Sequence, residues 1–440
     1  MTVDRAAAML ADVLAGPARL TELLEAYEAT GGPLAALPET FRGRPRVVLV
    51  GLGSSRHAAL DAATMLRAAG VAAWAEHASA GTPTPPGRDT ILVAISASGR
   101  TSEALDAVDR HRGSSLVVAV TNDPSQPLAT TADVVLPLFA GVEASGVSCR
   151  TFAATDAVLG LLAARLVPAL SAVADVRAAI DGLARLLDGR HAWLPDVAEL
   201  LDRSDAIGVV GGTGELGLAE QAALMLREGP RLPAVAHETG EWLHSAIYTA
   251  LPGYRAVLLA GSSSDAALVR VIAGRGGSTV VVGGRAANTG APITIETGSG
   301  PAARLARSAV GDLLATELWA RTRLADRNAS DLALPTQGSL TGRRSSPTIR
   351  ASSDPQREVH PLASHPDPSH RDRAPRHAPP RRLRRIRGQS LCAGTGERAT
   401  GFGCRPEQPA ERSARLARRH RDDLLGAERI ARRAAARPVP

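Results

Sequence analysis

Short runs of aliphatic residues alternate with longer amphipathic segments along most of this chain. The runs end at glycine or at a polar residue, which is typical of buried parallel strands. The amphipathic segments, which include most of residues 1–40, have apolar residues three and four positions apart, as in helices that cover a sheet. We therefore expect an α/β protein with strands near 46–51, 90–95, 115–120, 133–137, 206–211, 255–260, 278–283 and 292–296, and with helices over 54–69, 101–112, 151–187 and 301–323.

The chain also contains an internal repeat. Residues 49–79 align without a gap on residues 209–239, so that Gly51 falls on Gly211. The same alignment places Ala68 on Glu228. Strands that alternate with helices at this spacing predict two three-layer α/β lobes with parallel sheets, which bind ligands at the carboxyl ends of their strands. A carboxylate in only one copy suggests a single active site built from two unequal halves.

Charge divides the chain near residue 343. Residues 343–440 hold 23 arginines against 10 acidic residues, whereas the whole chain has a net charge of +7 and no lysine. This segment is rich in Arg, Pro, Ser and His and lacks an apolar period, so we expect it to be disordered. It could serve as an electrostatic tail, but a frameshifted reading of GC-rich DNA would give similar text, and we favour that interpretation. The basic charge lies in the tail and does not indicate specific nucleic-acid binding by the lobes.

Composition bounds the compartment and the domain plan. The three cysteines, Cys149, Cys392 and Cys404, lack the spacings of a zinc site or a disulfide framework, and neither a secretory signal nor a membrane-length apolar window is evident. We expect a cytoplasmic protein without a metal or other cofactor and without a membrane partner. The expected regions are N-terminal helices (1–40), a first lobe with a linking helix (41–190), a second lobe with a closing helix (191–335) and the tail (343–440).

A serine-rich loop follows the predicted strand 90–95. Its sequence is Ser96-Ala97-Ser98-Gly99-Arg100-Thr101. A turn between a strand and a helix offers free N–H groups where the helix dipole favours an anion, and Ser96, Ser98 and Thr101 add hydroxyl donors. Together with Ser55, after strand 46–51, these residues would suit a phosphate monoester. The alternative is ordinary helix capping, for which Ser54 or Ser55 is also well placed.

The second copy contains a glycine pattern that has to be weighed. Residues 212–217 read G-x-G-x-x-G between a strand and a helix, which is the dinucleotide-binding pattern. The equivalent loop of the first copy breaks the pattern, and no strand ending in an acidic residue follows at the required spacing. We favour tight glycine turns over a dinucleotide site.

A possible acid–base pair lies beyond these glycines. Glu228 ends an apolar helix before a Gly-Pro break, where it could face a cleft and move a proton between adjacent carbons of a sugar. Burial would raise its pKa towards neutrality. His244, with an ordinary pKa of about 6.5, could move the ring hydroxyl proton that opens a cyclic sugar. Taken alone, each residue is explained better in another way, Glu228 as a solvated glutamate at a helix end and His244 as a structural histidine.

Several of these segments resemble the SIS (sugar isomerase) domain family. The resemblance covers roughly residues 30–335 and is nearest to the isomerase half of glucosamine-6-phosphate synthases and to related phosphosugar isomerases and deaminases. It implies that Ser55 and the loop 96–101 hold a sugar phosphate, that Glu228 is catalytic, and that His244 opens the ring from a neighbouring subunit of a homodimer. It also suggests substrate contacts at Gly53, Arg100 and Ser148. The segments that carry the resemblance are 51–59, 96–103, 119–136, 223–228 and 237–244.

Departures from the family narrow the expected reaction. Ala97 and Arg100 stand where the family often has Gln and Glu, and the segment 146–151 lacks the lysine of the family's substrate loop. Met225 and Asp331 stand where synthases have active-site lysines, and the chain begins without their cysteine nucleophile. Arginine cannot replace a lysine amine as a nucleophile. We therefore expect aldose–ketose isomerisation or a related deamination of a hexose or hexosamine 6-phosphate, not dependent on glutamine; a non-catalytic sensor of such a ligand is the alternative.

Overall fold

A computed structural model describes residues 4–41, 45–170, 172–202, 204, 206–284, 291 and 293–322. The predicted tail (343–440) and the segment with Asp331 lie outside the described residues. No helix in the described ranges is long and apolar enough to cross a membrane.

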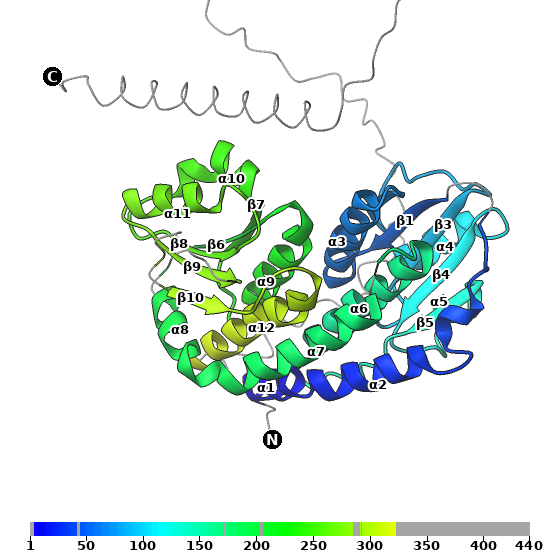
Figure 1. The fold of residues 1–440 in the computed structure, drawn as a ribbon, viewed down its shortest axis with the longest axis horizontal. Coiled ribbons are helices and arrows are strands. Elements are labelled where there is room, and N and C mark those ends of the chain that lie inside the picture. Colours follow the sequence, from blue (N-terminus) through cyan, green and yellow to red (C-terminus); the bar gives the residue numbers. More distant parts are fainter. Residues whose placement is uncertain are drawn as a thin grey trace, which may run out of the picture. The chain divides into compact units, whose positions relative to one another are not determined.

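The first lobe contains a parallel five-stranded sheet with the order β2-β1-β3-β4-β5 (Figure 1). Four of its strands are those expected from the aliphatic runs. The fifth, β2, was not predicted because it is a partly exposed edge strand with the sequence AAWAEH, which shows no continuous apolar run. The elements are β1 (Arg46–Gly51), α3 (Ser54–Ala68), β2 (Ala72–His77), β3 (Thr90–Ile95), α4 (Ser102–His111), β4 (Leu116–Thr121), α5 (Pro127–Thr131) and β5 (Val134–Pro137).

The second lobe repeats this topology. Its parallel sheet has the order β10-β9-β8-β6-β7, which is the order of the first sheet under the repeat, and its edge strand β7 was missed for the same reason as β2. The elements are α8 (Leu194–Asp202), β6 (Ile207–Gly211), η3 (Thr213–Glu215), α9 (Leu216–Glu228), β7 (Ala234–Glu238), α10 (Thr239–His244), η4 (Ala246–Thr249), β8 (Arg255–Leu259), α11 (Asp265–Gly274), β9 (Ser278–Gly283), β10 (Ile293–Glu296), η5 (Pro301–Ala303) and α12 (Arg304–Arg321).

Further helices precede and link the lobes. The predicted helix 151–187 is in fact two helices, α6 and α7. The chain leaves α6 at Val167 because Pro168 follows, and a residue that precedes proline disfavours helical dihedral angles. The largest apolar core is continuous through both lobes and includes the facing sides of α3, α6, α9 and α12. The elements are α1 (Arg5–Leu14), α2 (Gly16–Glu28), η1 (Pro33–Ala36), α6 (Arg150–Leu166), α7 (Ala172–Gly189) and η2 (Arg190–Ala192).

The two lobes pack through equivalent helices of the repeat, α3 and α9, which lie side by side between the sheets (Figure 1). The Asp61 carboxylate accepts the N–H groups of Gly217 and Leu218, at 2.7 and 3.0 Å. Gln221, the repeat equivalent of Asp61, lies 3.4 Å from the ring of His57, the equivalent of Gly217. The packing is therefore reciprocal. It is also close, because a Cβ on Gly217 would lie 2.1 Å from the His57 carbonyl oxygen.

We expect pH to act on this packing through Asp61. Burial raises the pKa of Asp61 from 3.8 to about 6, although Arg304 opposes the shift. Because the raised pKa makes the folded protein bind more protons between about pH 4 and 6, the contribution of Asp61 to stability falls as pH rises through that range. The melting temperature of the wild type relative to Asp61→Asn should therefore fall from pH 4 to 6 and then level off. A difference that rises over this range would contradict the assignment.

Candidate functional site

The loop after β1 leaves its serine hydroxyls uncommitted to the helix end. Gly53 is the N-cap of α3, with φ +53°, a conformation that glycine adopts readily, and no side chain caps the helix. The expectation that Ser54 or Ser55 caps α3 is therefore wrong, since both residues lie inside its first turn. Ser55 is partly exposed at the carboxyl edge of the sheet.

The loop after β3 brings three hydroxyl groups together. Ser96 is 3% exposed, and its Oγ lies 2.8 Å from Thr101 Oγ1 and 3.5 Å from Ser98 Oγ. Thr101 is the N-cap residue of α4, but no side chain caps that helix either. Gly99 has φ +64°, and a Cβ there would lie 2.7 Å from Gln126 Cβ, so the loop folds tightly on the chain that follows β4. The hydroxyl groups face one another, which argues against helix capping as their role.

Arg100 extends from the same loop. Its side chain is exposed, and its Nε donates to Gln126 Oε1 at 2.6 Å. Gln126 in turn donates to Asp123, at 2.7 Å. This chain of hydrogen bonds holds a guanidinium group beside the serine loop.

Contacts along α9 place Glu228 relative to the first lobe. Gly217 contacts Asp61, Gln221 contacts His57, and a Cβ on Gly53 would lie 4.0 Å from Leu224. These α9 positions are spaced by four and three residues, and Glu228 follows four residues later on the same helix face. Glu228 therefore lies beyond the N-terminus of α3, on the side where the loop after β1 emerges.

The surroundings of Glu228 shift its acidity. Its side chain remains more than a third exposed, yet enough protein surrounds the carboxyl group that desolvation raises its pKa, an effect that neighbouring Arg227 partly opposes. No hydrogen bond holds the carboxylate within the described chain. The group is thus free to exchange a proton with a ligand.

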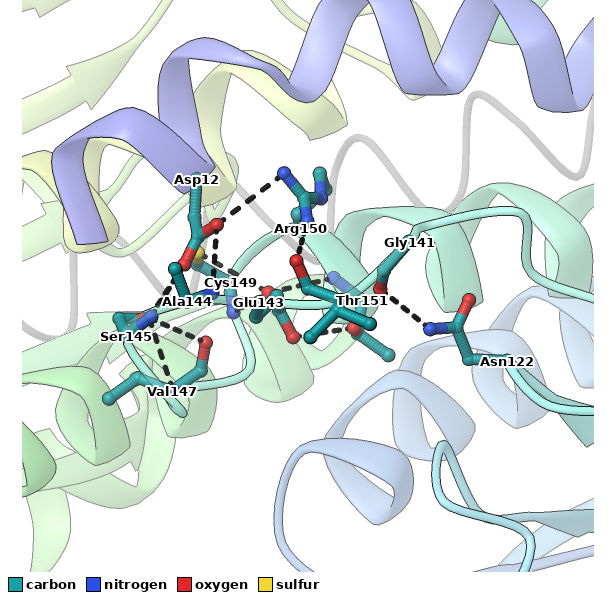
Figure 2. A network of polar contacts seen from close by, with 11 residues as sticks. Asp12, Asn122, Gly141, Glu143, Ala144, Ser145, Val147, Cys149, Arg150 and Thr151 are labelled. Carbon is teal, nitrogen blue, oxygen red and sulfur yellow. Dashed lines mark hydrogen bonds and ion pairs between the residues drawn. The ribbon is translucent and has the colours of Figure 1, made fainter. Parts of the chain in front are cut away.

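The loop that contains Ser148 is held by a buried carboxylate, Asp12, and a partly buried one, Glu143 (Figure 2). Asp12 of α1 accepts the N–H of Ser145 at 3.0 Å and its hydroxyl at 2.9 Å, and pairs with Arg150 at 3.5 Å. Glu143 accepts the N–H groups of Cys149 and Thr151 at the start of α6. These hydrogen bonds hold both ends of the loop, so its backbone is fixed in one conformation.

Ser148 itself faces α9. Its carbonyl oxygen accepts from Gln221 Nε2 at 2.8 Å, so the loop, α9 and α3 meet at Gln221. Asp12 and Gln221 could not be recognised from the sequence, because their partners are remote, by 133 positions in the case of Asp12 and Ser145. Glu143 has partners only six and eight positions away, but it belongs to no motif that would mark it.

His244 is not joined to this group of residues. It is exposed at the end of α10, which packs against β6, β7, η4 and α11, all in the second lobe. It makes no hydrogen bond or ion pair with any described residue of its own chain. Ser55 lies in the first turn of α3 and the carbonyl of Ser148 contacts α9, whereas the serine loop follows β3, the strand that pairs with β1. His244 stands apart from these segments.

The glycine pattern of residues 212–217 has a structural explanation. The N–H groups at the start of α9, where a dinucleotide would place its pyrophosphate, are already bonded to the Asp61 carboxylate. Gly217 is required by the approach of α3. In the described part of the chain, no group of three or more His, Cys, Asp or Glu side chains is arranged to hold a metal ion.

The fold and this arrangement of loops agree with a known domain. Residues 40–165 match the model of the SIS domain family. The first lobe is therefore a SIS domain, and the second lobe has the same three-layer architecture.

Individual relatives are consistent with this assignment. The chain is 30% identical over 295 residues to the glutamine–fructose-6-phosphate aminotransferase of Aeropyrum pernix, a match that covers 62% of this chain and 47% of that protein. The chain thus spans about half the length of this curated relative.

Solved structures share the fold over both lobes. The C-terminal domain of glucosamine-fructose-6-phosphate aminotransferase from Francisella tularensis has a TM-score of 0.62 at 16% identity and covers 72% of this chain and 96% of its own. Tagatose-6-phosphate ketose/aldose isomerase from Escherichia coli has a TM-score of 0.61 at 16% identity and covers 73% and 95%.

Proposed function

We propose that the protein is an isomerase, or isomerase and deaminase, of a hexose or hexosamine 6-phosphate, and that it does not depend on glutamine. The observation that carries the proposal is the cluster of Ser96, Ser98 and Thr101 hydroxyls, which cap no helix. The cluster lies in a SIS domain and follows β3, the strand next to β1, and the end of α9 lies near the loop after β1. Two similar proteins, an aminotransferase of fructose 6-phosphate and an isomerase of tagatose 6-phosphate, support this substrate class.

The proposed roles follow from the chemistry of the groups. Ser55, Ser96, Ser98 and Thr101 bind the phosphate oxygens, with Arg100 adding charge at the rim. Glu228 removes the proton from C2 of the aldose and returns it to C1 through a cis-enediol or enolamine. Gly53 lets the ligand approach the backbone, and the loop at Ser148 contacts the sugar.

Ring opening is assigned to His244 of a second copy of the chain. His244 is exposed and unpaired within the described residues, so it is available to a partner in a homodimer. The glutamine-dependent reaction is disfavoured because the buried Met225 side chain offers no amine on α9.

Phosphate binding predicts the effect of removing one hydroxyl. Ser98→Ala should weaken binding of glucosamine 6-phosphate by about 10- to 100-fold, the usual loss for a hydrogen bond to a charged group. Ser102→Ala is the matched control, because Ser102 is exposed one turn away and bonds only to Glu103. Titration calorimetry measures both variants. Equal affinities in the two would contradict the assignment of the loop.

A sensor without catalysis is the second candidate, favoured by the departures at Ala97 and Arg100. The test that separates the two is incubation of the protein with hexose and hexosamine 6-phosphates in D2O. Deuterium entering C1 or C2 supports an isomerase, whereas saturable binding without exchange supports a sensor.

A further inference from the structure

A large cavity in the described residues lies at the carboxyl edge of the second lobe's sheet, where helices of the first lobe cover it. It has a volume of about 740 Å³, within the range of sites for drug-sized ligands. Its polar end is formed by the loops after β6 and β8, and its apolar wall by α3, α6 and α7. None of the residues assigned above to the phosphate, to Glu228 or to His244 lines it.

This cavity is the repeat equivalent of the proposed substrate site. The alignment of the copies places Glu215 on Ser55 and Ala68 on Glu228. Strand pairing relates Ser262 to Ser98, since the N–H of Ala260 bonds to Val282 as that of Ser96 bonds to Val120. Glu215, Ala68 and Ser262 all line the cavity. The cavity therefore occupies the position in the second lobe that the proposed substrate site occupies in the first, but it has Ala68 where the substrate site has the glutamate base.

Its donors for a phosphate are already occupied. The N–H groups of Gly261 and Ser262 bond to the Asp265 carboxylate at 2.8 and 3.0 Å. Those at the start of α9 bond to Asp61. A phosphate ester would therefore meet carboxylates where the first lobe offers hydroxyls.

The charge of the lining is negative. The two guanidinium groups, of Arg304 and Arg307, are each paired with carboxylates inside the cavity wall. Glu215 Oε2 is buried without a hydrogen-bond partner, as is Nε of Arg307, whose side chain is 2% exposed. An unpaired acceptor and an unpaired donor next to an apolar wall fit a ligand whose hydroxyl groups both donate and accept hydrogen bonds. The acidic lining residues are Asp61, Asp156, Asp175, Glu215 and Glu238.

We propose that this cavity is a second binding site, for a hydroxylated amine that carries no phosphate, such as an amino sugar larger than a monosaccharide. The ammonium group is held by the excess carboxylates, and the hydroxyls by Ser262 and Glu215. The apolar face of the ligand lies against α3 and α6. The site binds without catalysis, because Ala68 stands where the other copy has its glutamate.

Calorimetry on the full chain tests this with the β-1,4-linked disaccharide of glucosamine as the probe. Wild type should bind it saturably, and Gly160→Leu should abolish binding, because Gly160 lines the cavity from α6 and a Cβ there meets open space. The matched control is Gly274→Leu, at the end of α11, where a Cβ also meets open space outside the cavity. Leucine has the higher helix propensity, which favours folding of both variants.

Charge is tested separately. Asp175→Asn should weaken binding of the disaccharide by about fivefold, the upper end for a solvent-accessible ion pair, whereas Asp181→Asn, on the same helix but outside the cavity, should leave it unchanged. The N-acetylated disaccharide, which has no ammonium group, should bind more weakly than the free amine. Equal binding of the two disaccharides, equal binding by Gly160→Leu and wild type, or no binding by wild type overturns the proposal.

The outcome is independent of the proposed function. Ser98→Ala should leave disaccharide binding unchanged, and an excess of glucosamine 6-phosphate should not displace the disaccharide. Displacement by the phosphate ester, or a loss of disaccharide binding in Ser98→Ala, would show that the disaccharide binds at the proposed substrate site of the first lobe. Either result would overturn the proposal of a second site.

Discussion

Glu228→Gln should reduce deuterium exchange into a bound sugar phosphate by about 10²- to 10⁴-fold, the usual contribution of a positioned general base. Glutamine keeps the shape of the side chain but cannot accept the proton. Because Glu228 is exposed at the last position of α9 and makes no hydrogen bond within the described chain, the change should leave the fold and the affinity for the phosphate ester intact. Mass spectrometry of the recovered sugar measures the exchange.

A matched control and a pH profile sharpen this test. Glu25→Gln, which changes an exposed carboxylate on α2, should leave exchange unchanged. Since desolvation raises the pKa of Glu228, the wild-type rate should rise with pH along a limb that lies above the range of an ordinary glutamate. Exchange that persists in Glu228→Gln would remove Glu228 from the mechanism.

Arg304→Ala should lower the free energy of unfolding by about 3–5 kcal/mol, the usual cost of breaking a buried ion pair from one side. Arg304 donates to Asp156 at 2.7 and 3.1 Å and to Asp61 at 3.0 Å, and both carboxylates are largely buried. Alanine leaves two negative charges facing each other without a cation. Urea denaturation of both proteins at pH 7 measures the loss.

The same helix supplies the control for this second prediction. Arg321 of α12 pairs with Glu317 at 3.0 Å, and both side chains are about a third exposed, so Arg321→Ala should cost no more than about 1 kcal/mol. The loss in Arg304→Ala should also shrink as pH falls below 6, because Asp61 then takes up a proton. Equal losses in the two variants would show that the ions around Arg304 contribute nothing special.

Much of the architecture could be predicted because it depends on local pattern. Eight strands could be predicted from continuous aliphatic runs, which are typical of a parallel sheet covered by helices on both faces. The edge strands β2 and β7 could not be found in this way, since residues such as Glu76 and Glu238 interrupt their apolar pattern. Pro168 is a local signal for the break between α6 and α7, although the apolar period continues across it.

The candidate site was predictable only in part, for a different reason. Ser96, Ser98 and Thr101 lie within six residues, so their grouping is visible in the sequence, and the structure brings their hydroxyls together. The capping role of Ser54 or Ser55 was wrong because a glycine in an unusual conformation, Gly53, takes the N-cap position. Asp12, Gln221 and Glu143 act through contacts that exist only once the chain has folded.

The reciprocal packing of α3 and α9 has a consequence for ancestry. The end of α9, from the second lobe, contributes to the proposed site of the first lobe, and the end of α3, from the first lobe, lines the cavity of the second. An ancestor with a single lobe would therefore have formed such a site only as a homodimer. That homodimer would have had two identical sites, and every mutation would have changed both, because one gene encoded them. In a single chain the two sites can differ, as they do here, where one has Glu228 and the other has Ala68 together with carboxylates such as Glu215.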